Sequence, residues 1–298
     1  MPSLGLKGSV GLGFHLLEVP VLEESVVRTA DGRDLGAVRW GDPSGSPVFV
    51  LHGTPGSRYL RHVGGEYERN GICAVTYDRP GYGRSTRASE RRVADSGADV
   101  VAIADALGIG RFSIVGISGG GPHALATAAT HPERVARCAT IVGVGPRDAE
   151  DLDFFAGMSE QDIDEMNQAA QAEDSKSDPF YLDTLKWADS VASSDALPVA
   201  VRDMIVEAMR EALVQGPGGM IDDYAVNAQA WGFDLADVQC LTSVMVARED
   251  TSVPPAHGYW LAEHLKHGEL VLVDGGHLGP REAAEEELLA WLTGTDRG

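Results

Sequence analysis

Residues 112–129 read FSIVGISGGGPHALATAA. The stretch starts with an apolar run typical of a buried strand and ends in a helix-like pattern. Between them lies G-x-S-x-G, in which Gly116 and Gly120 flank Ser118. A serine on such a turn is strained, and its neighbours must be small because side chains there would collide with nearby backbone. The stretch therefore predicts a strand, a sharp turn that presents the Ser118 hydroxyl, and a helix.

Further apolar runs on both sides of this stretch alternate with helix-like segments. Runs of this kind are typical of strands that are buried on both faces. They lie at residues 47–51, 72–77, 112–115, 139–144, 244–247 and 270–273. Because strand, helix and strand follow one another in this order, we expect an α/β fold with a mostly parallel sheet covered by helices.

A hairpin pattern precedes these runs. Two short β-like segments, residues 25–29 and 36–40, flank the turn signal Asp31-Gly32. The chain before them, residues 1–24, is an apolar N-terminal arm whose role the sequence leaves open. We therefore expect an antiparallel pair of strands at one edge of the sheet.

The middle of the chain interrupts the alternation. Residues 146–238 are acidic and helix-patterned, and they separate two portions of strand and helix, 25–145 and 239–298. A segment that interrupts a sheet is expected to pack over the strand ends as a helical cap. We therefore predict one core domain built from the two outer portions, with a cap inserted between them.

Charge and hydropathy restrict the partners. Lys and Arg number 24 and Asp and Glu 45, which gives a formal net charge of -21 at pH 7. Nucleic acid or an anionic membrane would be repelled, so we expect neither as a partner. No apolar stretch approaches the roughly 18 residues of a membrane helix, and residues 1–22 lack the features of a signal peptide. A cytoplasmic location is the expectation.

A serine needs a base and an orienting acid to act as a nucleophile at neutral pH. Asp250 follows the apolar run 244–247, and His277 follows the run 270–273 in Asp274-Gly275-Gly276-His277. Both positions are loops at strand ends, and the chain order Ser, Asp, His is one that this chemistry uses. Alternatives remain open: Glu249 and Asp148 for the acid, and His123 and His52 for the base.

Four segments together make the sequence similar to the α/β-hydrolase family. The match covers about residues 25 to 295. The segments are Leu51-His52-Gly53-Thr54-Pro55-Gly56, Tyr77-Asp78-Arg79-Pro80-Gly81-Tyr82-Gly83-Arg84-Ser85, Gly116-Ile117-Ser118-Gly119-Gly120, and the pair Asp250 and Gly276-His277. The resemblance implies an eight-stranded, mostly parallel sheet, a helical cap after the sixth strand, and acyl-transfer chemistry with no metal or organic cofactor.

The resemblance also implies roles for single residues. Ser118 would be the nucleophile, His277 the general base and acid, and Asp250 the group that orients the imidazole. The backbone N–H groups of Thr54 and Gly119 would form the oxyanion hole. The segment from Asp78 to Ser85 is expected to be a tight turn that supports the oxyanion side.

Substrate recognition is expected to come from the cap, where large apolar side chains suit a medium-sized, largely apolar ester. The predicted substrate-binding residues are Phe154, Phe155, Met158, Trp187 and Trp231. Family members with the same three residues also cleave carbon-carbon bonds or lactones, release N-terminal proline, or act as cofactor-free oxygenases. Gly119 stands where the proline-releasing enzymes carry tryptophan, which argues against that activity. A ligand-binding receptor on the same scaffold, and a homodimer, also remain open.

Overall fold

A computed structural model describes residues 23–193, 197–279 and 282–294 of the chain. The strands are β1 (Glu23–Arg28), β2 (Asp34–Gly41), β3 (Ser46–Leu51), β4 (Ile72–Tyr77), β5 (Phe112–Ile117), β6 (Val135–Ile141), β7 (Leu241–Ala247) and β8 (Gly268–Val273). The helices are α1 (Glu66–Arg69), α2 (Ser96–Ala106), α3 (Gly121–Thr130), α4 (Glu160–Ala169), α5 (Pro179–Ala192), α6 (Val199–Ala212), α7 (Gly218–Asn227), α8 (Pro255–His264) and α9 (Glu282–Leu292). Short 3₁₀ turns occupy Val93–Asp95, Ser118–Gly120 and Leu235–Asp237.

The described strands form one eight-stranded sheet in the order β1-β2-β4-β3-β5-β6-β7-β8. The pairs β1/β2 and β2/β4 are antiparallel, and all other neighbours are parallel. Gly32, in the turn between β1 and β2, has φ of 86°, a conformation that glycine adopts without strain. The predictions of a mostly parallel sheet and of an edge hairpin are confirmed.

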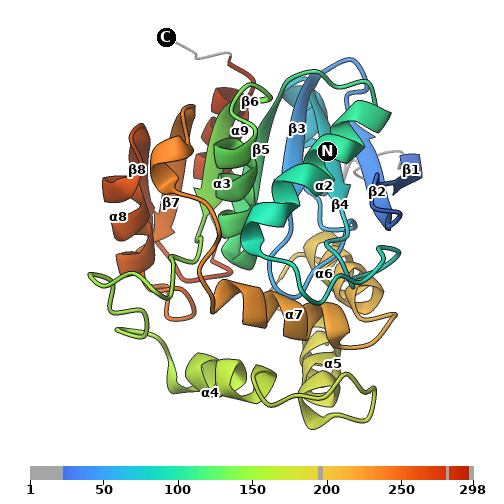
Figure 1. Cartoon of the computed structure of the whole chain (residues 1–298), viewed down its shortest axis with the longest axis vertical. Coiled ribbons are helices and arrows are strands. Elements are labelled where there is room, and N and C mark those ends of the chain that lie inside the picture. The colour runs from blue at the N-terminus through green and yellow to red at the C-terminus, as the bar shows by residue number, and fades with distance from the viewer. Residues whose placement is uncertain (1–22, 194–196, 280–281, 295–298) are drawn as a thin grey trace, which may run out of the picture.

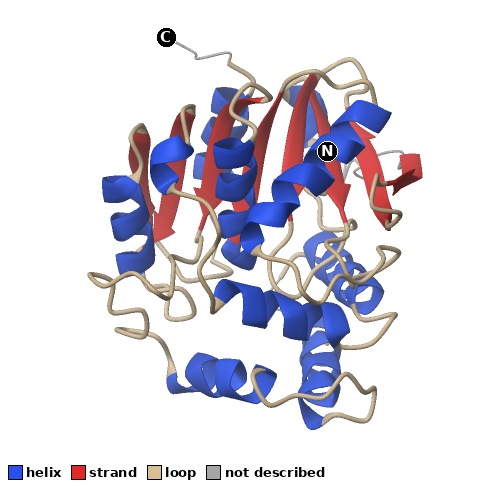
Figure 2. Ribbon diagram, viewed as in Figure 1, coloured by secondary structure: helices blue, strands red, loops and turns tan. Residues whose placement is uncertain are grey.

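Helices cover both faces of the sheet (Figures 1 and 2). On one face, α2, α3 and α8 pack on the sheet through side chains such as Ile103, Leu125 and Leu261. On the other face, α9 and the short α1 pack through Leu289 and Tyr67. With both faces covered, a central strand such as β4 is buried along its whole length, as the continuous apolar runs predict.

Helices α4 to α7 lie between β6 and β7 in the chain and beyond the carboxyl ends of the parallel strands in space (Figure 1). We call this part the helical insertion. Buried Arg58, in the loop after β3, bonds Glu211 of α6 at 2.6 Å. The side-chain amide of Gln215 donates to the carbonyl oxygens of Gly83 (2.8 Å) and Ser85 (2.9 Å), in the loop after β4. Polar contacts therefore hold the insertion on the loops that follow β3 and β4.

The predicted N-terminal arm and the predicted domain boundaries are not tested by the structure. The N-terminal arm, residues 1–24, lies outside the described residues except for Glu23 and Glu24, which begin β1. The division into a core of 25–145 and 239–298 with a cap of 146–238 stays a prediction. Within the described ranges, no helix combines the length and apolar character that crossing a membrane requires.

Candidate active site

Ser118 lies on the sharp turn between β5 and α3. Its φ is 52°, in the left-handed region that non-glycine residues rarely adopt. The flanking glycines permit this turn because there is no room for side chains. A Cβ on Gly116 would lie 2.2 Å from the carbonyl oxygen of Gly120, and a Cβ on Gly120 would lie 2.5 Å from that of His52. The local geometry is a strand, a strained turn and a helix around the serine.

His277 connects the side chains of Ser118 and Asp250. Nε2 of His277 lies 3.0 Å from Oγ of Ser118, and Nδ1 lies 2.8 Å from Oδ2 of Asp250. The three residues come from the turns after β5, β7 and β8, so the parallel sheet brings them to one edge. With Nδ1–H donating to the carboxylate, Nε2 is the acceptor for the Ser118 hydroxyl proton.

The backbone fixes the orientation of the Asp250 carboxylate. The residue is 3% exposed. Its Oδ1 accepts hydrogen bonds from the N–H groups of Ser252 (2.9 Å) and Val253 (2.8 Å). Because Oδ1 is held in this way, Oδ2 is the oxygen that faces His277.

The alternative acids and bases occupy other surroundings. Glu249 and Asp148 are exposed. His52 and His123 are fully buried, and desolvation together with the nearby Arg79 guanidinium lowers the pKa of each imidazole well below its usual value. Both buried imidazoles are therefore neutral near pH 7.

The predicted oxyanion-hole residues meet beside Ser118. A Cβ on Gly119 would lie 3.4 Å from the backbone nitrogen of Thr54, and a Cβ on Gly53 would lie 3.3 Å from Cβ of Ser118. The Thr54 hydroxyl oxygen lies closer still, 2.5 Å from the same Cβ on Gly119, so the loop after β3 lies against the turn that carries Ser118. Backbone N–H groups in such a place are suitable donors to a developing oxyanion. We call His52, Gly53 and Thr54 the oxyanion loop.

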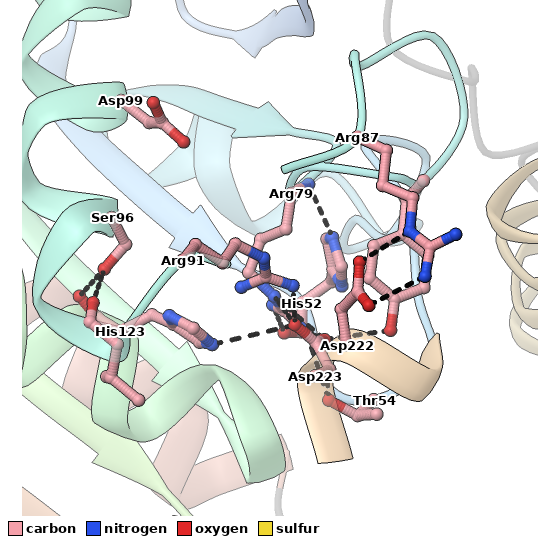
Figure 3. Close-up of polar contacts among 12 residues, drawn as sticks. His52, Thr54, Arg79, Arg87, Arg91, Ser96, Asp99, His123, Asp222 and Asp223 are labelled. Carbon is pink, nitrogen blue, oxygen red and sulfur yellow. Dashed lines mark hydrogen bonds and ion pairs between the residues drawn. The ribbon is translucent and has the colours of Figure 1, made fainter. Parts of the chain in front are cut away.

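A buried polar network contacts the oxyanion loop through His52 and Thr54 (Figure 3). At its centre are Arg79, from the loop after β4, and Asp223, from α7, both fully buried and ion-paired with each other. Arg91 forms a second ion pair with Asp223. Desolvation opposes ionisation of Asp223, but the two guanidinium groups outweigh it and hold the pKa of this carboxyl well below its usual range. The network therefore contains a charged carboxylate between two arginines.

The sequence did not identify Asp223 as a functional candidate. The residue belongs to an acidic helical segment, and the ordinary interpretation of such a segment is a solvated helix face. One signal was present: Asp223 lies three residues after Met220 and three before Val226, both of which are buried. Residues with this spacing share a helix face, so a carboxylate among them needs a buried partner.

Three of the predicted substrate-binding residues lie near the Asp250 turn. Phe154 and Met158 form a small apolar cluster with Val253, and Phe155 packs against its side. The cluster therefore adjoins the loop that carries the Asp250 carboxylate. Their contact with substrate stays a prediction.

The two predicted tryptophans lie elsewhere. Trp187, on α5, is 40% exposed. Trp231 is 5% exposed and belongs to the core that α2 and α3 cover, where it stacks on Phe233 with 5.7 Å between ring centroids. The chain after α7 turns back onto the core, where Trp231 packs, and contact of either tryptophan with substrate stays a prediction.

A cavity of about 410 Å³ lies next to the buried network. Arg33, Tyr77, Arg91 and Asp99 are among its lining residues. Ser118, Asp250 and His277 do not line it. This cavity is therefore distinct from the surroundings of the Ser118 hydroxyl. In the part of the chain that the structure describes, no group of three or more His, Cys, Asp or Glu side chains is arranged to hold a metal ion.

Comparison with known proteins identifies the family. The family model for the alpha/beta hydrolase fold matches residues 46–283. The chain belongs to the alpha/beta hydrolase family. An esterase from Exiguobacterium antarcticum has the same fold, with a TM-score of 0.69 and 18% identity over 91% of this chain and 99% of that one. The resemblance inferred from the four sequence segments is confirmed.

Curated relatives of this alpha/beta hydrolase carry names for different reactions. A proline iminopeptidase from Xylella fastidiosa (strain 9a5c) is 35% identical over 120 residues, which are 39% of this chain and 38% of that protein. The 2-hydroxy-6-oxo-6-phenylhexa-2,4-dienoate hydrolase of Comamonas testosteroni is 28% identical over 257 residues, 81% of this chain and 85% of that protein. The first match spans less than two fifths of the relative's length.

Proposed function

We propose that this alpha/beta hydrolase is a serine hydrolase that cleaves a carboxylic ester, or a related acyl bond, through an acyl-enzyme on Ser118. The observation that carries the proposal is the hydrogen-bonded series from Ser118 Oγ to His277 (3.0 Å) and from His277 to Asp250 (2.8 Å). It supplies a nucleophile, a base and an orienting carboxylate within hydrogen-bond reach of one another. The activity belongs to the carboxylesterase class.

In the first half of the reaction, Ser118 Oγ forms a bond to the carbonyl carbon while its proton passes to His277 Nε2. The tetrahedral adduct then breaks its bond to the leaving alcohol, which takes the proton from the imidazolium. In the second half, water gives a proton to His277 and attacks the acyl carbon, and the acid leaves as Ser118 recovers its proton. Asp250 stabilises the imidazolium in both halves and keeps its own charge.

The oxyanion of each tetrahedral adduct would accept hydrogen bonds from the backbone N–H groups of Thr54 and Gly119. Such donors typically contribute about 2.7–4 kcal/mol of barrier lowering each. The observation that supports these two donors is the close approach of the Thr54 nitrogen to Gly119, beside Ser118. A medium-sized, largely apolar acyl group suits the apolar cluster of Phe154 and Met158 next to the Asp250 turn.

The test combines labelling and turnover. A fluorophosphonate should label the wild-type protein at Ser118, and p-nitrophenyl esters of rising acyl length should be hydrolysed. Ser118→Ala should abolish labelling and lower kcat on the order of 10⁴-fold or more. Ser44→Ala, an exposed serine in a surface turn, is the matched control and should retain both properties. Turnover that survives in Ser118→Ala would overturn the proposal.

Carbon-carbon bond hydrolysis at the same site is the second candidate, because the Comamonas relative is matched over 81% of this chain. A 2-hydroxy-6-oxodienoate should be a better substrate than any ester if this candidate is correct. Proline p-nitroanilide tests the reaction named for the Xylella relative, against which Gly119 argues. Stabilisation by ligands without turnover of any substrate would instead support a receptor.

A further inference from the structure

We propose that Asp223, on α7 of the helical insertion, is a positioning residue that orients the oxyanion loop through Arg79. The inference deepens the proposed function and rests on it, because it assigns a role toward the Thr54 N–H in the same site. Neither Asp223 nor Arg79 touches the reacting atoms of the proposed mechanism. Their effect on the reaction would come through the backbone that they hold.

The guanidinium group of Arg79 holds the oxyanion loop by two of the loop's carbonyl groups. Nη1 donates to the carbonyl oxygen of His52, and Nη2 donates to that of Gly53 at 2.9 Å. Nη2 also lies 3.2 Å from the hydroxyl of Thr54. Arg79 is completely buried, so these hydrogen bonds are shielded from water. One planar cation therefore fixes two consecutive carbonyl groups of the loop.

Holding the Gly53 carbonyl also aims the proposed oxyanion donor. The Gly53 carbonyl and the Thr54 N–H belong to one planar peptide, in which a trans bond points them in opposite directions. With the oxygen drawn toward Arg79, the Thr54 N–H points to the opposite side of the loop. The turn that carries Ser118 borders Thr54: a Cβ on Gly119 would lie 2.5 Å from the Thr54 hydroxyl oxygen and 3.4 Å from the Thr54 nitrogen.

Asp223 in turn holds Arg79. Its Oδ2 accepts from Nε of Arg79 at 3.1 Å, from the hydroxyl of Tyr82 at 2.8 Å and from the hydroxyl of Thr54 at 2.9 Å. Oδ1 accepts from Arg91. Asp223 thus contacts both the arginine and the loop that the arginine holds. Without its charge, Arg79 and Arg91 would face each other as two buried cations, and the guanidinium of Arg79 would lose the partner that sets its plane.

The source of this carboxylate gives the arrangement a functional meaning. Asp223 comes from the insertion, whereas the loop and Arg79 come from the segments after β3 and β4. The oxyanion donor is therefore oriented only when α7 is docked on those segments. The insertion would contribute to transition-state stabilisation as well as to substrate binding.

Asp223→Asn tests the proposal, and Asp222→Asn is its matched control. Asp222 is the adjacent residue of α7, is also buried, and pairs with a different arginine, Arg87, at 2.7 Å. Hydrolysis of p-nitrophenyl butyrate is measured for each variant, with rates normalised to the active sites that a fluorophosphonate titrates. Asp223→Asn should lower kcat about 10- to 100-fold, as for a misplaced catalytic group, while KM changes less than about threefold. Asp222→Asn should keep both constants.

A transition-state analogue distinguishes an effect of Asp223 on the orientation of the oxyanion donor from an effect on the stability of the fold. Inhibition by an alkyl boronic acid, which forms a tetrahedral adduct with the serine, should weaken in Asp223→Asn by about the same factor as kcat/KM falls. A merely structural loss would lower the titrated fraction and leave kcat per active site unchanged. That result would overturn the proposal.

The double variant Arg79→Gln/Asp223→Asn covers the case in which Asp223→Asn fails to fold. It removes both members of the Arg79–Asp223 ion pair and leaves only Arg91 without its carboxylate, whereas Asp223→Asn leaves both arginines so, and it should therefore be the more stable variant and still show the lowered kcat. A wild-type kcat in the double variant would overturn the positioning role. Ser118→Ala in the same assay separates failure of the proposed function from failure of this inference. Turnover without Ser118 refutes the proposed function. Turnover that depends on Ser118, with a normal kcat in Asp223→Asn, refutes only the role of Asp223.

Discussion

Asp250→Asn should inactivate the enzyme by changing the tautomer of His277 while the fold stays intact. Oδ1 of Asp250 accepts from two backbone N–H groups, those of Ser252 and Val253. An asparagine must keep its amide oxygen there, because the opposite orientation would place its NH₂ against two donors. The NH₂ group then faces Nδ1 of His277, which now has to accept. The imidazole proton moves to Nε2, which can no longer take the proton of Ser118.

The size of the effect follows from the loss of the base. A wrong tautomer with unchanged geometry lowers kcat about 10⁴-fold, which corresponds to an activation barrier about 5.4 kcal/mol higher. The free energy of unfolding should change by only about 1 kcal/mol, because every buried polar group of the turn keeps a partner. Asp250→Ala should be less stable than Asp250→Asn, since it leaves the N–H groups of Ser252 and Val253 without their acceptor.

The assay is p-nitrophenyl butyrate hydrolysis, with thermal unfolding recorded on the same samples. Glu249→Gln is the matched control, because Glu249 is the adjacent acid and is exposed. It should retain kcat within about twofold. If Asp250→Asn kept more than a tenth of the wild-type kcat, the tautomer argument would be refuted. If Glu249→Gln lost activity instead, the orienting acid would be the neighbouring residue.

Three further outcomes are expected. Thr54→Pro should lower kcat about 10²–10³-fold because it removes a backbone donor, whereas Thr54→Ala should cost less than about tenfold because Asp223 keeps its arginine partners; equal losses in kcat would contradict a backbone role. Gly116→Ala should unfold at a lower temperature in a thermal melt, since its Cβ would lie 2.2 Å from the carbonyl oxygen of Gly120; an unchanged melting temperature would contradict this contact. The pKa of Asp223 is depressed, so its stabilisation is complete above the ordinary carboxyl pKa near 4 and is lost as pH falls below it; urea unfolding between about pH 3 and 6 should show a shallower acid decline in Asp223→Asn than in wild type, and parallel curves would argue against it.

Local patterns in the sequence predict the centre of the fold well. The apolar runs mark the buried strands because a sheet covered on both faces needs continuous apolar segments. The turn at Ser118 is predictable from a local pattern as well. Gly116 and Gly120 lie so close to neighbouring backbone that a side chain would not fit, and G-x-S-x-G is the sequence pattern of such a turn. The order of Ser118, Asp250 and His277 followed from their positions at strand ends.

Contacts between distant segments were not predictable in the same way. Arg79 and Asp223 are 144 residues apart, and neither sits in a pattern that indicates the other. The packing partners of Trp231 were likewise not predictable. Its hydrophobicity predicts that the side chain is buried, but it does not indicate which part of the protein covers it. Tertiary docking of the insertion decides both positions.

The ion pair between α7 and the loop after β4 limits how such enzymes can be re-engineered. Exchanging residues 146–238 for the corresponding part of another hydrolase, in order to import a new specificity, would also remove the acidic partner of Arg79. A chimera of this kind should be slow on every ester unless the graft carries a carboxylate at the position of Asp223. If Asp223 has the proposed role, the helical insertion of this protein cannot be exchanged without also changing the orientation of the oxyanion loop.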